Sequence, residues 1–73
     1  MTLQNAMLTL TINGKPREIA AETPLLQYLA DNGINPRAVA IEHNGDILKR
    51  DRFEEVVLRA GDNLEILRMI GGG

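Results

Sequence analysis

The chain has 73 residues, a formal net charge of −2, no cysteine and no serine. At this length one domain buries only about 60% of its unfolded surface, so a deep catalytic cleft is hard to build. Scattered cations and only two aromatic residues, Tyr28 and Phe53, argue against nucleic-acid binding. Without cysteine or serine, disulfides, thiolate zinc sites and serine or cysteine nucleophiles are excluded.

The first half of the chain predicts a β-hairpin. Residues 1–6 show no periodic pattern and are expected to form a loose lead-in. Leucine or isoleucine alternates with threonine over 8–12, and a second strand is expected over 17–20, after the turn residues Asn13-Gly14. Pro16 cannot donate a ladder hydrogen bond, so this second strand is expected at an edge of the sheet.

The next stretch predicts one helix of about three turns. Thr23 is expected as its N-cap, with Pro24 in the first helical position, where the missing N–H costs nothing. Leucines recur at helical spacing over 25–29. Gly33 is expected to end the helix in the left-handed conformation.

The second half predicts another hairpin, over 39–42 and 46–48, with its turn at Asn44-Gly45. One short helical turn is expected over 50–54, with its phenylalanine in the core, before a final strand over 64–70. Together the elements predict an α+β domain in two layers. One helix packs across one face of a mixed sheet of four to five strands, in which the first and last strands are the central parallel pair.

The chain ends on Gly71-Gly72-Gly73, directly after the last predicted strand. Glycine loses the most conformational freedom on ordering and has no side chain to bury, so a flexible tail over 71–73 is expected beyond a single domain over 7–70. A backbone without Cβ atoms can be enclosed from every side. Gly71 and Gly72 are therefore expected to thread through a narrow tunnel in a partner. From the tail alone, fraying or a cloning remnant is an open alternative.

Strand parity predicts a docking surface beside this tail. If Leu64 and Ile66 face the helix, at least one of Leu67 and Met69 lies on the solvent face, beside the threonines of the first strand. Exposed apolar residues there indicate partner docking, although a bulge that turns Leu67 inward is an alternative. The candidate docking residues are Leu67, Arg68, Met69 and Ile70.

Catalytic and metal-binding side chains are not expected. His43 is the only histidine, and no Asp, Glu or His set around it has metal-ligand spacing, so it is expected to be exposed or at a strand edge. No apolar run approaches 18 residues and no leader precedes the domain, so the chain is expected to be soluble and cytoplasmic, without membrane contact.

Five segments carry a family resemblance: Leu10–Lys15, Val39–Gly45, Asp46–Arg50, Leu58–Ile66 and Ile70–Gly73. A Gly-Asp pair before an apolar strand that runs straight into terminal glycines is the most specific part. On these segments, nearly the full length from Met7, the chain resembles the ubiquitin-like β-grasp sulfur carriers of thiamine biosynthesis, the ThiS family.

The resemblance implies a protein substrate rather than an enzyme. The carboxylate of Gly73 would be adenylated by a separate E1-like enzyme that uses ATP and Mg²⁺, then converted to a thiocarboxylate (1-thioglycine). A sulfur donor such as a cysteine desulfurase and a thiazole synthase would be the other partners, and the chain itself would bind no cofactor. The chemistry is reasonable because a carboxylate, with a pKa of about 3.5, is ionised at neutral pH and offers no good leaving group until AMP is attached.

Two alternatives share the fold and the glycine ending. One is the small subunit of molybdopterin synthase, which the chain resembles less, because Leu67–Ile70 stands where that family carries a Phe-Pro-Pro-like stretch. The other is a ubiquitin-like modifier attached to lysines through Gly73. A third interpretation gives the tail no function: a small structural domain that ends in glycines by chance.

Overall fold

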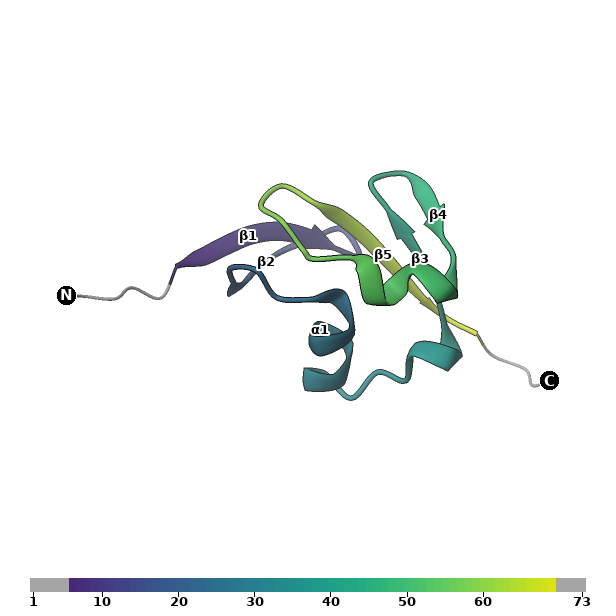
Figure 1. Cartoon of the computed structure of the whole chain (residues 1–73). Helices are drawn as coiled ribbons and strands as arrows, with labels where there is room; N and C mark the ends of the chain where they lie inside the picture. Colours follow the sequence, from purple (N-terminus) through teal and green to yellow (C-terminus); the bar gives the residue numbers. More distant parts are fainter. Residues whose placement is uncertain (1–5, 70–73) are drawn as a thin grey trace.

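The computed structural model describes residues 6–69; residues 1–5 and 70–73 lie outside that range. Most of the predicted lead-in, the glycine tail and Ile70, the last residue of the predicted domain, therefore fall outside the described residues. Within them the chain forms one five-stranded mixed sheet in the order β2-β1-β5-β3-β4, with the helix α1 on one face (Figure 1). The predicted α+β architecture is confirmed.

The first hairpin pairs β1 (Met7–Ile12) with β2 (Lys15–Ala20) in antiparallel register. Asn13 and Gly14 both have positive φ angles, 52° and 81°, as the predicted tight turn requires. β2 is the outermost strand, so the prediction that Pro16 marks a sheet edge is confirmed.

The helix α1 (Leu25–Asp31) has seven residues, about two turns rather than the expected three. The prediction that Thr23 caps it is wrong, because Pro24 takes the N-cap position and the Thr23 hydroxyl donates to the Ala20 carbonyl at 2.6 Å. The reason is tertiary: Pro24 forms an isolated bridge with Val57, which holds it extended and delays the helix by one residue.

The helix ends as predicted. Gly33 has a φ of 69°, its N–H donates to the Ala30 carbonyl at 3.1 Å, and the Ile34 N–H donates to the Leu29 carbonyl at 2.9 Å. This pair of bonds is the Schellman motif, in which a left-handed glycine satisfies the last helical carbonyls.

The second half contains two short 3₁₀ helices and three strands. In chain order they are η1 (Pro36–Ala38), β3 (Val39–His43), β4 (Asp46–Leu48), η2 (Arg50–Glu55) and β5 (Asn63–Arg68). η2 is the helical turn expected around Phe53, whose side chain is buried. η1 was not predicted; it starts where the Asn35 side chain accepts a hydrogen bond from the Arg37 N–H at 2.9 Å.

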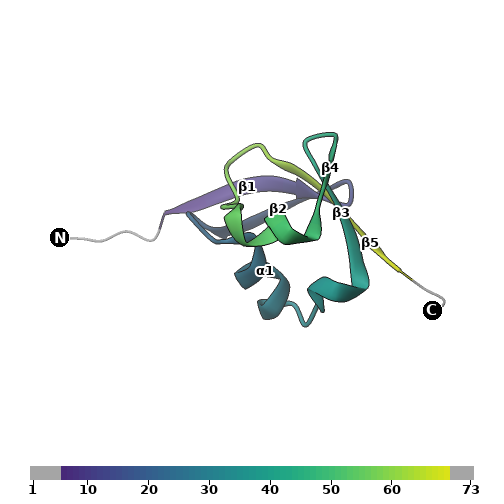
Figure 2. The ribbon, with the colours of Figure 1, turned by 45° about the vertical axis from the view of Figure 1, so that its right-hand side comes forward.

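The core lies between the sheet and the layer formed by α1 and η2 (Figure 2). The Leu25 N–H donates to the Val56 carbonyl at 2.9 Å, which fastens the start of α1 to the segment after η2. The buried apolar residues are Leu10, Ile12, Leu25, Leu29, Val39, Ile41, Phe53, Leu58, Leu64 and Ile66.

β5 joins the two hairpins at the centre of the sheet. It pairs with β1 in parallel, as expected, but only at Thr11 with Asn63 and at Ile12 with Leu64. Its antiparallel pairing with β3 is longer and includes every residue of β3: His43 lies opposite Leu64 at one end, and Val39 lies opposite Arg68 at the other. The last part of β5 therefore extends beyond the end of β1 and is held mainly by β3.

Candidate functional site

The candidate site is the end of β5, where the chain runs toward its terminal glycines. Gly71, Gly72 and Gly73, for which tail threading and modification are expected, and Ile70, a candidate docking residue, lie outside the described residues. The described part of the site is thus Leu67, Arg68 and Met69 with the groups that hold them in place.

Leu67 lies on the face of the sheet away from α1. Leu64 and Ile66 point into the core, so the period of two places Leu67 on the opposite side, where it is 54% exposed. Met69, one residue past the end of β5, is 59% exposed and lines a hollow with Ile34 and Asn35, which follow α1. Leu67 stands directly opposite Ala40 of β3. No bulge turns it inward, so the exposure expected from strand parity is confirmed.

The prediction of which residues lie beside Leu67 and Met69, the exposed apolar pair, is wrong. The sequence predicted the threonines of β1, but Thr11 is level with Asn63, and β1 ends at Ile12, level with Leu64. Because the two strands run in the same direction, Leu67 lies three residues past the end of β1. The apolar pair therefore lies on the half of the sheet formed by β5 and β3.

Arg68 lies on the other face of β5 from Leu67. It is directly opposite Val39, a buried residue of the helix side, and lines a hollow there together with Lys15 and Arg17. The structure therefore divides the candidate docking residues: Leu67 lies on the outer face of the sheet, and Arg68 lies on the helix side. A partner that contacts both residues must reach both faces of the β5 end.

The Asn13 side chain fixes β5 where β1 ends. Its amide nitrogen donates to the Ile66 carbonyl at 3.2 Å, and its Oδ1 accepts from the Ile66 N–H at 2.7 Å. These two bonds reproduce a backbone pairing one step beyond the strand. From the sequence, Asn13 was interpreted only as a turn residue. The one sequence signal for its second role is that the turn has asparagine, which has a side-chain amide, where glycine would also allow a positive φ angle.

A buried polar cluster supports the other end of β5. Asp62 is 8% exposed, and its carboxylate accepts from the Arg59 N–H at 3.0 Å and from Asn44 Nδ2 at 3.2 Å, and lies 3.1 Å from His43 Nε2. The Oδ1 atom of Asn44 also accepts from the Asn63 N–H at 2.8 Å. The cluster fastens the turn before β5 to the β3–β4 hairpin.

Opposing effects set the pKa of Asp62. Burial raises it, but the hydrogen bonds from the Arg59 N–H, His43 and Asn44, with attraction to His43, outweigh burial and hold this pKa below its ordinary value. His43 was expected to be exposed or at a strand edge. It is instead partly buried at the end of an inner strand and bonded to Asp62.

Two further observations concern residues 6–69 only. No group of three or more His, Asp or Glu side chains there could hold a metal ion. None of the helices in that range is long and apolar enough to cross a membrane.

Comparisons with known proteins agree on one family. The model of the ThiS family matches residues 10–73, which include the three terminal glycines. The sulfur carrier protein ThiS of Bacillus subtilis is 34% identical over 65 residues, which are 88% of this chain and 98% of that protein. The crystal structure of a thiamine biosynthesis protein (ThiS) from Geobacter metallireducens superposes with a TM-score of 0.77 at 32% identity, covering 90% of this chain and 100% of that one.

Longer relatives match over part of their length. A thiazole synthase of Paramagnetospirillum magneticum is 36% identical over 66 residues, which are 90% of this chain but 20% of that protein. A thiazole synthase of Magnetococcus marinus is 37% identical over 62 residues, 85% of this chain and 19% of that protein. The chain thus spans about a fifth of the length of these two relatives. The family match over most of the chain, the full-length relative and the shared fold establish that this chain belongs to the ThiS family.

Proposed function

We propose that the chain is a sulfur carrier of thiamine biosynthesis and that Gly73 carries the sulfur as a C-terminal thiocarboxylate. The observation that carries this proposal is the family match, which extends through Gly73. A relative named as a sulfur carrier protein, matched over 98% of its length, supports the same role. The relatives named thiazole synthase support an enzyme of that kind as the recipient.

The proposed chemistry has three steps, all on partner proteins. A carboxylate oxygen of Gly73 attacks the α-phosphorus of ATP, and pyrophosphate leaves; Mg²⁺ on the partner steadies the phosphate charge. The terminal sulfur of a persulfide, on a donor such as a cysteine desulfurase, then attacks the acyl carbon, and AMP leaves with the oxygen. A thiol attacks the other sulfur of the resulting acyl disulfide, which releases the thiocarboxylate and leaves a disulfide on the donor. The product is a thiocarboxylate, a soft nucleophile suited to sulfur delivery.

The described residues support this role by positioning the tail. β5 is bonded to β3 through Arg68, and to Asn13 at Ile66 on its other edge. The Met69 N–H donates to the Ala38 carbonyl at 2.9 Å, one residue beyond the strand. The point from which the tail leaves is therefore fixed, which reduces the entropy lost when the tail enters a partner site.

The experiment compares the full chain with a variant that lacks Gly73. Incubation with the adenylating enzyme, ATP, Mg²⁺, a cysteine desulfurase with cysteine, and a thiol reductant should raise the intact mass of the full chain by the difference between sulfur and oxygen. The shortened variant should keep its melting temperature and show no ATP–pyrophosphate exchange. Equal exchange by both forms would refute Gly73 as the reacting residue, and recovery of the chain joined to lysines in its host would favour a modifier.

A further inference from the structure

A hollow on the helix side of the sheet gathers three cations. We call it the basic groove and define it by Lys15 and Arg17 of β2, Arg68 of β5, and a floor of Ile12, Val39 and Ile66. Its volume is about 400 Å³. Lys15 and Arg17 pair with buried residues of β1, and Arg68 pairs with buried Val39, so strand register also places all three on this face.

The positive charge of the basic groove is not neutralised by the described residues. The side-chain ion pairs within residues 6–69 are His43 with Asp62 and Arg52 with Glu55, and no lining residue of the groove is acidic. Yet the chain has ten acidic residues against eight cationic ones. A concentration of unpaired cations on a net acidic protein indicates complementarity to a negatively charged ligand.

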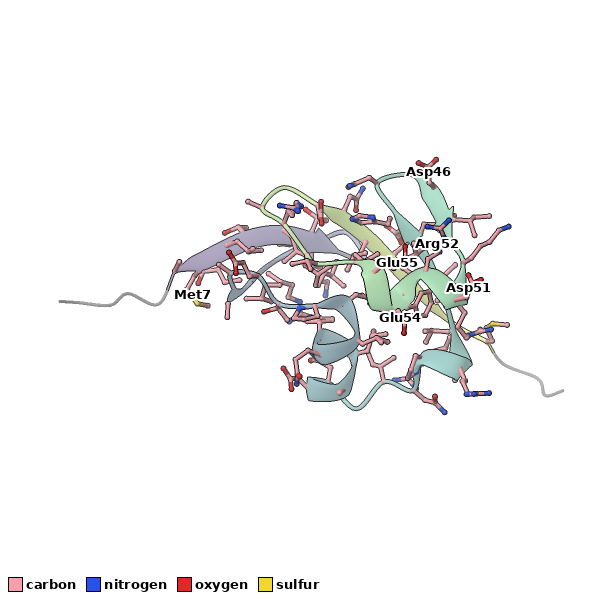
Figure 3. The ribbon with its side chains drawn as sticks, in the orientation of Figure 1. Met7, Asp46, Asp51, Arg52, Glu54 and Glu55 are labelled. Atoms are coloured by element: carbon pink, nitrogen blue, oxygen red, sulfur yellow. The ribbon has the colours of Figure 1, made fainter. Side chains whose placement is uncertain are left out.

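Several acidic side chains lie away from the groove. Asp51, Glu54 and Glu55 come from η2, and Asp46 lies at the tip of the β3–β4 hairpin (Figure 3). Glu18 and Asp31 line an adjoining hollow together with Arg17, but neither forms an ion pair with a cation among the described residues.

The spacing of the cations indicates an extended ligand rather than one phosphate group. Strand register gives their positions along the sheet, because Ile12 pairs with both Lys15 of β2 and Leu64 of β5. Arg17 lies two residues from Lys15 in one direction along the strands, and Arg68 lies four residues from Leu64 in the opposite direction. At about 3.3 Å per residue, Arg17 and Arg68 are separated by roughly 20 Å along the strands. An extended peptide of about six residues covers that distance.

The Arg68 end of the groove also offers an open strand edge. The backbone groups of Ile66 are bonded to Asn13, whereas the Met69 N–H points the other way, to Ala38 of the β3 side. By alternation, the N–H and C=O of Arg68 point to the Asn13 side, where β1 has ended and no described strand follows. An extended segment can bond to these groups as an added strand.

We propose that the basic groove binds an acidic, extended segment of about six residues on the partner that receives the C-terminal tail. The partner assignment rests on the proposed function: the groove ends at Arg68, at the base of the tail, so a protein that encloses the tail passes over it. A nucleic-acid strand is disfavoured, because the chain is net acidic and Tyr28 is the one aromatic side chain that lines the groove, too few to stack successive bases.

The first test titrates the ¹⁵N-labelled chain with a blocked acidic hexapeptide of sequence EDEEDE. We expect saturable shifts of amides along the groove, Arg68 included, and no comparable shifts with the amide control QNQQNQ. Lys15→Glu/Arg17→Glu should weaken binding about tenfold or more, because like charges then face the peptide. The control Lys49→Glu/Arg59→Glu makes the same change in net charge at exposed cations outside the groove and should bind like wild type.

The second test measures the affinity of the same variants for the adenylating enzyme and the thiazole synthase. At least one partner should lose about tenfold or more in affinity for Lys15→Glu/Arg17→Glu, but not for the control. Unsaturable peptide binding, equal behaviour of the two double variants, or tighter binding of a single-stranded hexanucleotide would overturn the groove proposal. Failure of the sulfur-carrier proposal gives a different result, in which the wild-type chain shows no ATP–pyrophosphate exchange with the adenylating enzyme. The peptide titration does not depend on that reaction, so it tests the groove in either case.

Discussion

Asp62 is the buried charged side chain among the described residues, and it connects three separate parts of the chain. Its carboxylate binds the turn at Arg59, the histidine that ends β3 and the asparagine of the β3–β4 turn. Buried carboxylates are stable when hydrogen bonds replace their lost hydration. The site therefore holds the ionised form, which makes the stability of the fold sensitive to acid.

The first prediction concerns this acid sensitivity. Because the folded pKa of Asp62 is lowered, the unfolded chain takes up this proton first as pH falls past the ordinary aspartate pKa of about 3.9. The stabilisation is thus fully present above that pH and is lost as pH falls toward the folded pKa. Asp62→Asn should lower the free energy of unfolding at pH 7 by about 1–3 kcal/mol and flatten its decline below pH 4.

Denaturant unfolding at a series of pH values from 7 to 3 measures both effects. Asp46→Asn, at the exposed tip of the β3–β4 hairpin, is the matched control and should keep the wild-type pH profile. If Asp62→Asn also keeps that profile, the lowered pKa does not contribute to acid unfolding.

At the scale of elements, β5 presents different chemistry on its two faces. Leu64 and Ile66 fill the core, Leu67 and Met69 form the exposed apolar pair, and Arg68 borders the basic groove. A strand with a period of two delivers these surfaces from consecutive residues. Exposed apolar side chains at the end of β5 are suited to contact with a partner protein.

The second prediction tests this apolar pair. Leu67→Asp should weaken binding to the adenylating enzyme or the thiazole synthase by about 2 kcal/mol or more, as expected for an interface anchor. It should lower the free energy of unfolding by about 0.5 kcal/mol or less, because the side chain is already in solvent. Met7→Asp is a close control: Met7 is also 54% exposed, but it lies at the far end of β1 (Figure 3).

Titration calorimetry beside thermal melting separates the two effects. A large fall in melting temperature for Leu67→Asp would show that the residue supports the fold. Equal loss of binding in the Leu67 and Met7 variants would remove the docking role from the β5 end.

At the scale of the whole molecule, two hairpins are joined through β5 at the centre of the sheet. The direct pairing of β1 with β5 covers two residue pairs, and the Asn13 side chain extends it at one end. At the other end the Thr11 N–H donates to the Asp62 carbonyl and the Gly61 N–H donates to the Thr9 carbonyl, each at 2.9 Å. These contacts hold β5 against β1 on either side of their short pairing.

The third prediction concerns threading of the tail, which lies outside the described residues. If partner walls close on bare backbone at Gly72, the branched side chain of Gly72→Val should slow adenylation on the order of 100-fold through misplacement of the carboxylate. Gly72→Ala should show a smaller loss. Adenylate formation at matched concentrations, with core amide exchange as the folding control, measures this series. Full activity of the valine variant would mean an open groove on the partner.

Local sequence determined most of the elements. Asn13-Gly14 and Asn44-Gly45 each specified a hairpin turn through positive φ angles, and Gly33 specified the end of α1. Alternation specified which β5 residues face outward. These features depend on a residue and its close neighbours, so short-range chemistry suffices to predict them. The terminal glycines and the Gly-Asp turn likewise identified the family.

Only the tertiary structure decided which distant residues meet. It moved the helix start past Thr23 through the bridge at Pro24, gave Asn13 a partner 53 residues away in Ile66, and brought Arg68 to the same groove as Lys15. Such contacts depend on strand order and register, which place side chains together regardless of their separation in sequence. The hydrophobic pattern within a strand specifies which of its side chains face the core. The pairing register between strands determines which side chains from different strands form a common site.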